Sequence, residues 1–533
     1  MASPLSILKT VINLKHIHVE SLECLKVPVT KFGQVAEQEH IIVHARPFKR
    51  KQCLCPICKQ KCVCNGRKHT SASHWRAPNL NGVPVFIAYC PQRIYCLEHG
   101  ALNEYIPWSD GTSRFTEDFN NEVAWMVCQM TKTAIAAYLG INWRTVGHCV
   151  NAAHGRIEPD VTDRLRGLRR ICIDETSYSS GHCYITVVYD LDRNRVVWVH
   201  DKHGRDVFEE FCMLLTPEER ERIEVVAGDG ARWIDSCVKD FLPNAVRCVD
   251  FFHVVEWANQ ALDKVRVSTA NKALREYNQR KSELMQLAES AERIRKDALQ
   301  ELESMPKRGR PSKRKQELME TLRKLDEFTA QQDTQVPGSS KLEQASADLD
   351  NLLKGSNAVR GAKHALGHRP ERRTENQTDT VKLIENSFPD LYRAYQLKEA
   401  LRLILHMKQP QQAKDELTKW ISEAGESELK PIAELSAKIN RHYTNIINSV
   451  TYQVNSAKSE STNTTIKSLI KLARGFRNLD NMISLIYLKC SDLVIPLNNR
   501  IQPTPEYQAM MRDIANERRR AREEALRLQV AWA

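Results

Sequence analysis

The chain has 533 residues, of which 42% are hydrophobic, and its 78 Lys and Arg against 66 Asp and Glu give a net charge of +12. This length allows several cores, and the positive excess favours a polyanionic partner. No apolar run is long enough to span a bilayer, since Lys489 and Asp492 interrupt DNMISLIYLKCSDLVIPL, and the N-terminus lacks a signal-peptide cleavage pattern. We therefore expect a soluble intracellular protein.

Seven of the sixteen cysteines gather between Cys53 and Cys96, where a high content of Cys, Pro and Asn predicts short strands and turns from about residue 35 to 108. Two residues separate the members of each pair in CPIC and CLEH, so that both members reach one tetrahedral zinc ion. The spacing predicts a zinc ribbon with structural Zn²⁺ on Cys55, Cys58, Cys96 and His99. Two alternatives stay open, namely free thiols in a small β-domain or substitution by the nearby Cys53, Cys62, Cys64 and Cys90.

Apolar residues take helical spacing from about residue 115 to 154. The stretch TKTAIAAYLGINWRTVGHCVN predicts a helix, a turn at Gly140 and a second helix. In a helix-turn-helix the second helix enters the major groove of DNA. The residues that would face DNA are then Asn142, Trp143, Arg144 and Thr145. The alternative is an ordinary helical pair with a glycine C-cap.

Strands and helices alternate from Arg169 to about Trp257. RRICIDETSY, CYITVVYDLD and NRVVWVHD predict three consecutive strands, and DVFEEFCMLL predicts a helix. A strand in RIEVVAGDG, a helix in ARWIDSCVKDFL and a strand in AVRCVDFF follow. This order predicts a mixed sheet in an α/β domain.

Asp174 and Asp229 each follow the apolar residues of one predicted strand, so we expect both at strand ends of one sheet. Neighbouring carboxylates repel each other unless a cation neutralises them, and oxygen ligands suit Mg²⁺ or Mn²⁺. With a third acid, such a pair builds a two-metal site for in-line attack on a phosphodiester. The alternative is that Asp229 only caps the next helix. Rival acids nearby are Glu175, Asp190, Asp192 and Asp250.

A charged, glycine-poor and helical region covers about residues 258–455. PKRGRPSKRK at residues 306–315 and the expected linker AQQDTQVPGSS at residues 330–340 interrupt it. The Arg-Gly-Arg-Pro core around Arg310 can lie extended in an A·T-rich minor groove, although an exposed basic loop is the simpler interpretation. We expect Trp420 to belong to the core of this region.

The order of these features, together with IDE, GDG, D-x-x-HV, E-x-x-N-x-x-IK and GFRN, resembles the ISL3 family of insertion-sequence transposases. The resemblance extends from about Cys53 to Leu488. It implies a ribonuclease H-like domain with a DDE triad, in which an all-helical insertion separates the second Asp from the Glu. The triad residues that it implies on this chain are Asp174, Asp229 and Glu460.

The resemblance also implies a supporting role for Asp250 and His253, which match the D-x-x-H after the next strand. They would position the site or its substrate. Mg²⁺ or Mn²⁺ would act at the triad. The implied partner is double-stranded DNA, as transposon ends and as target, and the pairing of ends implies a homodimer or a larger assembly.

Glu460 precedes a basic helical pattern. If a helix begins there, the residues on its face three, four, seven and eleven positions later are Asn463, Thr464, Lys467 and Lys471. The acid would reach the metals, while Lys467, Lys471 and Arg474 would lie along a phosphate backbone. Gly475, the first residue of GFRN, would then end the helix.

The expected fold class is a multidomain α/β plus α protein, with a zinc ribbon, a helix-turn-helix and a ribonuclease H-like mixed sheet that a large all-helical insertion interrupts. The expected domains are 1–110 with the zinc ribbon, 111–165 with the helix-turn-helix, 166–258 as the first catalytic part, 259–455 as the insertion, 456–500 as the second catalytic part, and 501–533 as a basic helical tail.

The predicted function is that of a DNA transposase, which binds terminal inverted repeats and catalyses metal-dependent strand cleavage and transfer in the cytoplasm, at the bacterial nucleoid when on DNA. Two alternatives stay open. One is a DNA-binding transcriptional regulator whose ribonuclease H-like domain is inactive, and the other is a structure-specific nuclease. Metal-dependent strand transfer separates the transposase from both.

Overall fold

The structure is a computed structural model of the chain. The residues that it describes are 16–31, 34–67, 71–111, 113–179, 181, 183–305, 312–329, 341–454, 457–473, 475–497, 510, 513 and 517. They belong to two compact units, which are residues 1–222 together with 458–533, and residues 223–457. The expected linker at 330–340 lies outside the described residues, as do Arg310 and most of the expected tail.

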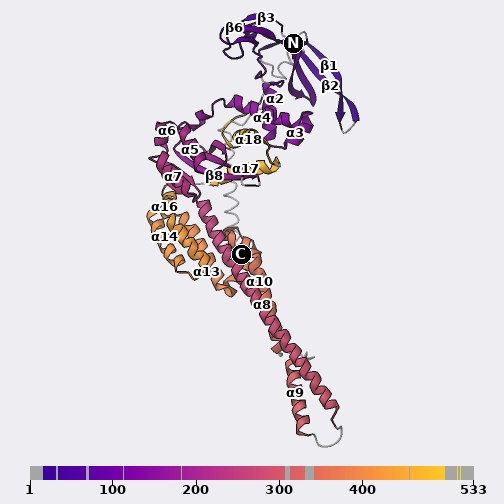
Figure 1. Cartoon of the computed structure of the whole chain (residues 1–533), viewed down its shortest axis with the longest axis vertical. Helices are drawn as coiled ribbons and strands as arrows, with labels where there is room; N and C mark the ends of the chain where they lie inside the picture. Colours follow the sequence, from indigo (N-terminus) through magenta and orange to yellow (C-terminus); the bar gives the residue numbers. More distant parts are fainter. Residues whose placement is uncertain are drawn as a thin grey trace. The chain divides into compact units, whose positions relative to one another are not determined.

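The first unit begins with two small sheets (Figure 1). A four-stranded sheet has the order β1-β2-β5-β4, and a three-stranded sheet has the order β3-β6-β7. Their strands are β1 (Ile17–Lys31), β2 (Gln34–Pro47), β3 (Val63–Arg67), β4 (Ser73–Leu80), β5 (Val83–Tyr89), β6 (Gln92–Cys96) and β7 (Gly100–Asn103). Trp75 and Trp108 pack edge to face in the core of the larger sheet, with ring centroids 5.7 Å apart. The long β1–β2 hairpin begins well before the expected start of the strands at about residue 35.

Three helices follow in the region where the sequence predicts helical structure: α2 (Glu117–Val127), α3 (Lys132–Leu139) and α4 (Trp143–Ile157). Thr131 starts α3 because its hydroxyl accepts the N–H of Ala134 at 3.1 Å. Gly140 ends α3 in the left-handed conformation, with φ of 66°, which a glycine adopts without steric cost. The turn brings α4 onto the other two helices, and the helix-turn-helix prediction is confirmed.

The α/β region contains every strand and helix that the sequence predicts, in the predicted order. In the first unit, β10-β9-β8 form antiparallel neighbours. In the second unit, β11 and β12 pair in parallel, so both kinds of pairing occur in this region, as predicted. The elements are β8 (Arg170–Ser179), β9 (Cys183–Asp190), β10 (Arg195–Asp201), α5 (Arg205–Leu214), a short unpredicted α6 (Pro217–Arg222), β11 (Val225–Gly228), α7 (Arg232–Phe241) and β12 (Val246–Val249).

Two further helices, α17 (Ala457–Leu472) and α18 (Leu479–Cys490), complete the first unit. Leu469 of α17 and Leu485 and Leu488 of α18 join the buried core of the helix-turn-helix. Gly475 lies between the two helices with φ of 93°, and its N–H bonds to the carbonyl of Ile470 at 3.2 Å. Asn478 then caps α18 by accepting the N–H of Asn481. The motif GFRN therefore contains the turn between these helices.

The rest of the second unit is helical, as expected. Its helices are α8 (Phe251–Glu303), α9 (Lys313–Thr329), α10 (Lys341–Gly361), α11 (Lys363–Gly367), α12 (Glu375–Ser387), α13 (Pro389–Leu405), α14 (Pro410–Gly425), α15 (Lys430–Arg441) and α16 (Tyr443–Thr451). Trp420 is only 2% exposed and its indole N–H donates to the carbonyl of Leu397 at 2.8 Å, so its predicted place in the core is confirmed. None of the described helices is both long and apolar enough to cross a membrane.

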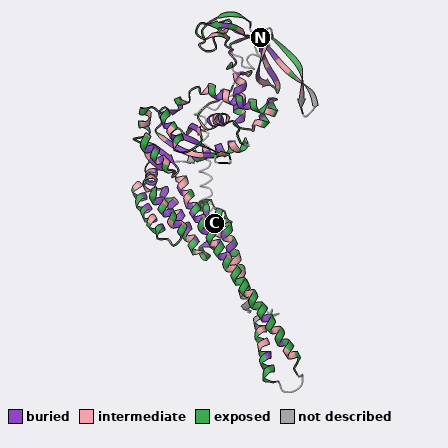
Figure 2. Cartoon of the chain, viewed as in Figure 1, coloured by how far each residue is buried: buried purple, intermediate pink, exposed green. Residues whose placement is uncertain are grey.

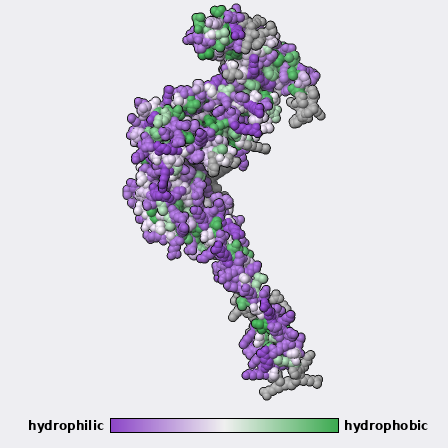
Figure 3. Space-filling model, in the orientation of Figure 1, coloured by the Kyte–Doolittle hydropathy of each residue, from purple (hydrophilic) through white to green (hydrophobic). Residues whose placement is uncertain are grey.

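Helix α8 extends beyond the packed helices of the second unit, and α9 lies along its distal part (Figure 1). A bidentate ion pair between Arg314 and Glu301 joins the two helices. Most residues of this arm are exposed (Figure 2), and its surface in the view of Figure 3 is largely hydrophilic. Ala298 of α8 and Leu318 of α9 are among the few buried residues of the arm.

Candidate active site

Asp174 lies in the middle of β8, because the strand continues to Ser179 instead of ending at the acid as expected. In the register, Asp174 is opposite Val187 of β9. Its carboxylate oxygen Oδ1 accepts the N–H of Glu175 at 2.8 Å. The position is half-buried, and the first candidate acid therefore lies on a strand and not in a loop.

The other carboxylate oxygen of Asp174 accepts a hydrogen bond from the side-chain amide of Asn463 on α17. The amide oxygen of Asn463 accepts the hydroxyl of Tyr189 on β9 at 2.5 Å. Burial, and then the charge of Asp174, raise the pKa of Tyr189 well above its ordinary value, so the phenol stays a donor. Asn463 and Tyr189 are 7% and 3% exposed, and both bonds are shielded from water.

Glu460 lies in the first turn of α17, as the sequence predicts, and its side chain is exposed. It precedes Asn463 by three residues, almost one helical turn. Because Asn463 contacts Asp174, the turn of α17 that bears Glu460 is held next to β8. Lys467 and Lys471 lie farther along α17 and are exposed, whereas Arg474 lies outside the described residues.

Asp229 belongs to the second unit and comes directly after β11. Its Oδ1 accepts the N–H of Ala231 at 2.9 Å, which forms a local turn just before α7 (Arg232–Phe241). The backbone carbonyl of Asp229 accepts a hydrogen bond from the guanidinium of Arg247 on β12. Arg247 is buried and also donates to Asp235 at 3.0 Å. The buried guanidinium of Arg247 therefore fixes the loop that carries Asp229. No sequence motif indicated this role of Arg247.

Asp250 and His253 lie at the start of α8 in the second unit. The carboxylate of Asp250 accepts the N–H of Phe252 at 2.9 Å and caps the helix. The N–H of Asp250 donates to the carbonyl of Gly228 at 2.8 Å, which ties the end of β12 to the end of β11. The ring of His253 lies 3.8 Å from a carboxylate oxygen of Glu256. In this structure Asp250 organises the strand ends next to Asp229.

Cys55, Cys58, Cys96 and His99 form one cluster, in which the ligand atoms all lie within 4.8 Å of one another. The sulfur of Cys55 is 3.7 Å from Nδ1 of His99, and the sulfurs of Cys58 and Cys96 are 3.8 Å apart. A compact group of three thiols and one imidazole matches the donor set of a tetrahedral structural zinc site. Among the alternative cysteines, Cys53 and Cys64 pair in a disulfide.

The predicted DNA-facing residues lie at the N-terminus of α4. Asn142, Trp143 and Arg144 are exposed, whereas Thr145 is half-buried. The side-chain oxygen of Asn142 accepts the N–H of Arg144 at 2.9 Å, so Asn142 is the N-cap of α4. The guanidinium of Arg144 lies 5.6 Å from the centre of the Trp143 ring.

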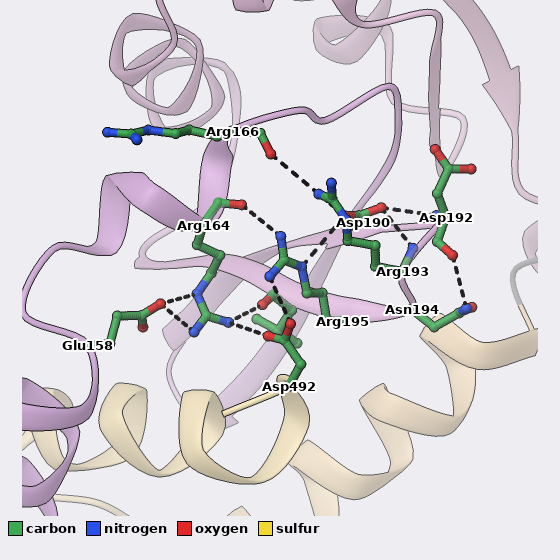
Figure 4. Close-up of polar contacts among 10 residues, drawn as sticks. Glu158, Arg164, Arg166, Asp190, Asp192, Arg193, Asn194, Arg195 and Asp492 are labelled. Carbon is green, nitrogen blue, oxygen red and sulfur yellow. Dashed lines mark hydrogen bonds and ion pairs between the residues drawn. The ribbon is translucent and has the colours of Figure 1, made fainter. Parts of the chain in front are cut away.

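A buried polar network joins the far end of α4 to the α/β region of the same unit (Figure 4). Arg164 is 3% exposed and donates to Glu158 at 2.7 Å and to the carbonyl of Val196 on β10 at 2.8 Å. Its guanidinium also lies 5.0 Å from the ring of Tyr487 on α18. The hydroxyl of Tyr487 accepts the N–H of Val199 on β10 at 3.0 Å. The end of the helix that would read DNA is thus connected to β10 of the same unit.

The chain is similar to known transposases over most of its length. The family model for ISL3 DDE transposases, described as "Transposase", matches residues 171–351 and 339–486. The model described as "Helix-turn-helix domain of transposase family ISL3" matches residues 104–151. Among curated proteins, the transposase for insertion sequence element IS1557 of Mycobacterium tuberculosis is 31% identical over 448 residues, which cover 84% of this chain and 88% of that protein. The transposase for insertion sequence element IS1001 of Bordetella parapertussis is 25% identical over 231 residues, or 42% of this chain and 54% of that protein.

These similarities and the confirmed helix-turn-helix define a transposase with a DNA-binding domain. The chain belongs to the ISL3 family of insertion-sequence transposases.

Proposed function

We propose that this transposase cuts and joins DNA through a DDE triad of Asp174, Asp229 and Glu460 on a ribonuclease H-like domain. The observation that carries the proposal is the hydrogen bond from Asn463 to Asp174, because it holds the helix of Glu460 against the strand of Asp174. Two acids far apart in the sequence thereby share one neighbourhood of the first unit. Asp229, directly after β11, supplies the third acid of the proposed triad.

The residues fit divalent cations, since all three offer carboxylate oxygens, which Mg²⁺ and Mn²⁺ prefer. Bound Mg²⁺ or Mn²⁺ would supply a water of lowered pKa and would stabilise the leaving oxygen. Asp174 is suited to hold such ions in place, because the N–H of Glu175 and the amide of Asn463 fix the orientation of its carboxylate. Glu460 is exposed and can reach a ligand from the first turn of α17.

DNA would bind through exposed side chains on two helices of the first unit. Trp143 and Arg144 at the start of α4 would contact the terminal inverted repeats in the major groove. Lys467 and Lys471 on α17 would contact phosphates next to the acids. Hydrolysis at the transposon end breaks the bond between phosphorus and the 3′ oxygen and leaves a 3′-OH. That hydroxyl then attacks a target phosphodiester and releases a new 3′ end, without a covalent protein intermediate.

We also propose structural Zn²⁺ on Cys55, Cys58, Cys96 and His99, because these four ligands complete a tetrahedral site without a further protein ligand. In the proposal the ion stabilises the small N-terminal domain and takes no part in strand cleavage. Because two ends have to be joined, we propose that the active assembly is a homodimer or larger.

The test is cleavage and joining of labelled DNA that carries the terminal repeats, in Mg²⁺. Asp174→Asn, Asp229→Asn and Glu460→Gln should each abolish both reactions and preserve binding to the ends. Glu426→Gln, a substitution at an exposed acid of the helical region, is the matched control and should leave both reactions intact. Binding without cleavage by the wild type in Mg²⁺ and Mn²⁺ would favour a regulator, and cleavage without joining would favour a nuclease.

A further inference from the structure

We propose that Asn463 and Tyr189 form a positioning pair, which orients the carboxylate of Asp174 for metal binding and sets its spacing from Glu460. The inference rests on the proposed DDE function and deepens it. Its basis is a chain of two hydrogen bonds through three elements, from the hydroxyl of Tyr189 on β9 to the amide of Asn463 on α17 and on to Asp174 on β8.

The strand register explains why Tyr189 can take part. Tyr189 is directly opposite Cys172, two residues before Asp174 on β8. Side chains alternate between the faces of a strand, so Cys172, Asp174 and Tyr189 all point to the same face of the sheet. Helix α17 contributes Asn463 to that face. The hydroxyl of Tyr189 therefore reaches the amide diagonally across the two strands.

The chemistry of the pair determines which way the amide points. The hydroxyl of Tyr189 donates to the amide oxygen, which leaves the amide nitrogen to donate to the carboxylate of Asp174. The reversed amide would place its oxygen against the carboxylate, where two acceptors repel each other. Because both side chains are more than nine-tenths buried, water does not readily replace either bond.

Each oxygen of Asp174 then has a defined donor. The N–H of Glu175 bonds to Oδ1, and the amide of Asn463 bonds to Oδ2. Donors on both oxygens fix the plane of the carboxylate before any cation arrives. Loss of a group that hydrogen-bonds to a metal ligand commonly lowers metal affinity about 10- to 100-fold. We expect an effect of about this size here.

The same contact controls the distance between two acids. Glu460 and Asn463 are three residues apart on α17 and lie on adjacent parts of one helix side. The bond from Asn463 fixes α17 against β8, and with it the first turn that carries Glu460. Thr464 and Lys467, on the exposed side of α17, have no comparable contact with β8 among the bonds of the described residues. The E-x-x-N spacing thus combines the proposed ligand Glu460 with Asn463, the residue that positions the other proposed ligand, Asp174.

The test compares Tyr189→Phe and Asn463→Ala with Asp174→Asn in the full chain. Mn²⁺ binding to the protein without DNA is measured by electron paramagnetic resonance, and cleavage of end DNA is titrated with Mg²⁺. Tyr178→Phe on β8 is the matched control, because it removes a hydroxyl that bonds to Asp201 at 3.2 Å in the same sheet. Thr464→Ala is the control on α17.

We expect Tyr189→Phe to raise the dissociation constant for Mn²⁺ about tenfold, and to raise the Mg²⁺ concentration for half-maximal cleavage by a similar factor. Excess Mg²⁺ should restore most of the rate, while binding of end DNA stays unchanged. Asn463→Ala should have the larger effect, since it removes both bonds. The controls should titrate like the wild type.

Wild-type Mn²⁺ binding in both Tyr189→Phe and Asn463→Ala, with binding lost in Asp174→Asn, would overturn the positioning role and leave the DDE proposal intact. Wild-type Mn²⁺ binding and cleavage in Asp174→Asn would overturn both. Thermal unfolding of each variant shows whether the fold persists, and Tyr189→Phe keeps the buried ring and so decides the question if Asn463→Ala does not fold.

Discussion

The indole of Trp257 lies directly against Gly230, the residue that follows Asp229. A Cβ at Gly230 would be 2.7 Å from both Cη2 and Cζ2 of Trp257 and 3.2 Å from Nε2 of His442. The ammonium of Lys438 lies 3.8 Å from the centre of the same indole ring. The second glycine of GDG is therefore required because no room is left for a side chain at this position of the second unit. Trp257 on α8 packs onto the loop that carries the candidate acid Asp229.

Gly230→Ala should displace the indole of Trp257 or the loop of Asp229. We expect an overpacking cost of about 1–3 kcal/mol and a loss of strand cleavage that exceeds any loss of end binding. Gly230→Ala combined with Trp257→Phe should recover cleavage, because the two contacting ring carbons belong to the part of the indole that phenylalanine lacks. The assay is cleavage of labelled end DNA together with thermal unfolding.

Gly155→Ala is the matched control, since a Cβ at Gly155 meets no atom within 4 Å outside the nearby backbone of its own helix. It should leave cleavage within error of the wild type and, because Gly155 lies inside α4, should raise stability by about 0.5–1 kcal/mol. Full activity of the single Gly230→Ala variant would show that the indole is free to move aside and that the glycine serves another purpose.

Removal of zinc should selectively unfold the part of the N-terminal region that contains the cysteine cluster and the three-stranded sheet. The ligand atoms of Cys55, Cys58, Cys96 and His99 lie within 4.8 Å of one another, and few other buried apolar residues are near them. Metal binding should therefore contribute much of the folding free energy of this part, whereas the four-stranded sheet has a core of its own. We expect purified protein to release about one Zn²⁺ per chain when denatured with a chelating dye, from the single predicted site. Cys58→Ser should lose that zinc.

Cys90→Ser is the matched control for the zinc site, because Cys90 is close in sequence and is not a member of the cluster. It should keep a full complement of zinc. Zinc retained in Cys58→Ser and lost in Cys90→Ser would place the ion on a different set of cysteines.

Apart from the short α6, the strands and helices from residue 170 to 249 could be predicted from sequence, because each has a clear apolar pattern between breaks. The boundary after β12 was harder to predict. AVRCVDFF continues as an apolar run, but the carboxylate of Asp250 accepts the N–H of Phe252 and starts α8 inside the expected strand. A capping side chain thus overrides the apolar pattern there.

The inward role of Asn463 could not be predicted, for a different reason. Its helix carries buried polar residues, Ser459 and Asn463, on the side that packs inward, so hydrophobic periodicity does not identify that side. Its partner Tyr189 is 274 positions away in the sequence. The role of the buried Arg247 could not be predicted either, because only the folded strands show that its guanidinium donates a hydrogen bond to the loop of Asp229. The spacing of the motifs indicated the acids, and the packing identified the residues that hold them.

Arg144→Ala should weaken binding to the terminal repeats without destabilising α4. Its guanidinium is exposed at the helix start and contributes its N–H, not its side chain, to the cap. Loss of a direct base contact costs about 1–3 kcal/mol, or roughly 10- to 100-fold in affinity. The measurement is the dissociation constant for end DNA and for scrambled DNA at one fixed salt concentration.

Asn142→Asp separates recognition from capping in the same helix. Aspartate caps a helix as well as asparagine does, so thermal stability should stay unchanged. The added negative charge next to phosphates should still weaken DNA binding.

The control for Arg144→Ala is Lys382→Ala on α12, which also removes one exposed positive charge. Equal weakening on end DNA and scrambled DNA by Arg144→Ala would show that Arg144 contacts only the backbone.

Glu158→Gln should loosen the network that joins α4 to β10, and the effect should depend on pH. Burial alone would raise the pKa of Glu158, but the ring of His154, 3.4 Å away, and the hydrogen bond from Arg164 outweigh it and leave that pKa below its ordinary value. The stabilisation by ionised Glu158 is therefore complete above the unfolded pKa, about 4.3, and is lost as pH falls through the lower folded pKa. At pH 7 the variant leaves the buried guanidinium of Arg164 with only the more distant carboxylate of Asp492, 3.9 Å away, at a cost of about 3 kcal/mol. Hydrogen exchange of peptides from α4 and β10 should show this difference at pH 7 and a smaller one toward pH 3.

Glu210→Gln, in an exposed pair with His200 at 3.2 Å, is the control and should change exchange little at any pH, since exposed ion pairs contribute little. An equal loss of protection at every pH would mean that the size of the Glu158 side chain matters and its charge does not.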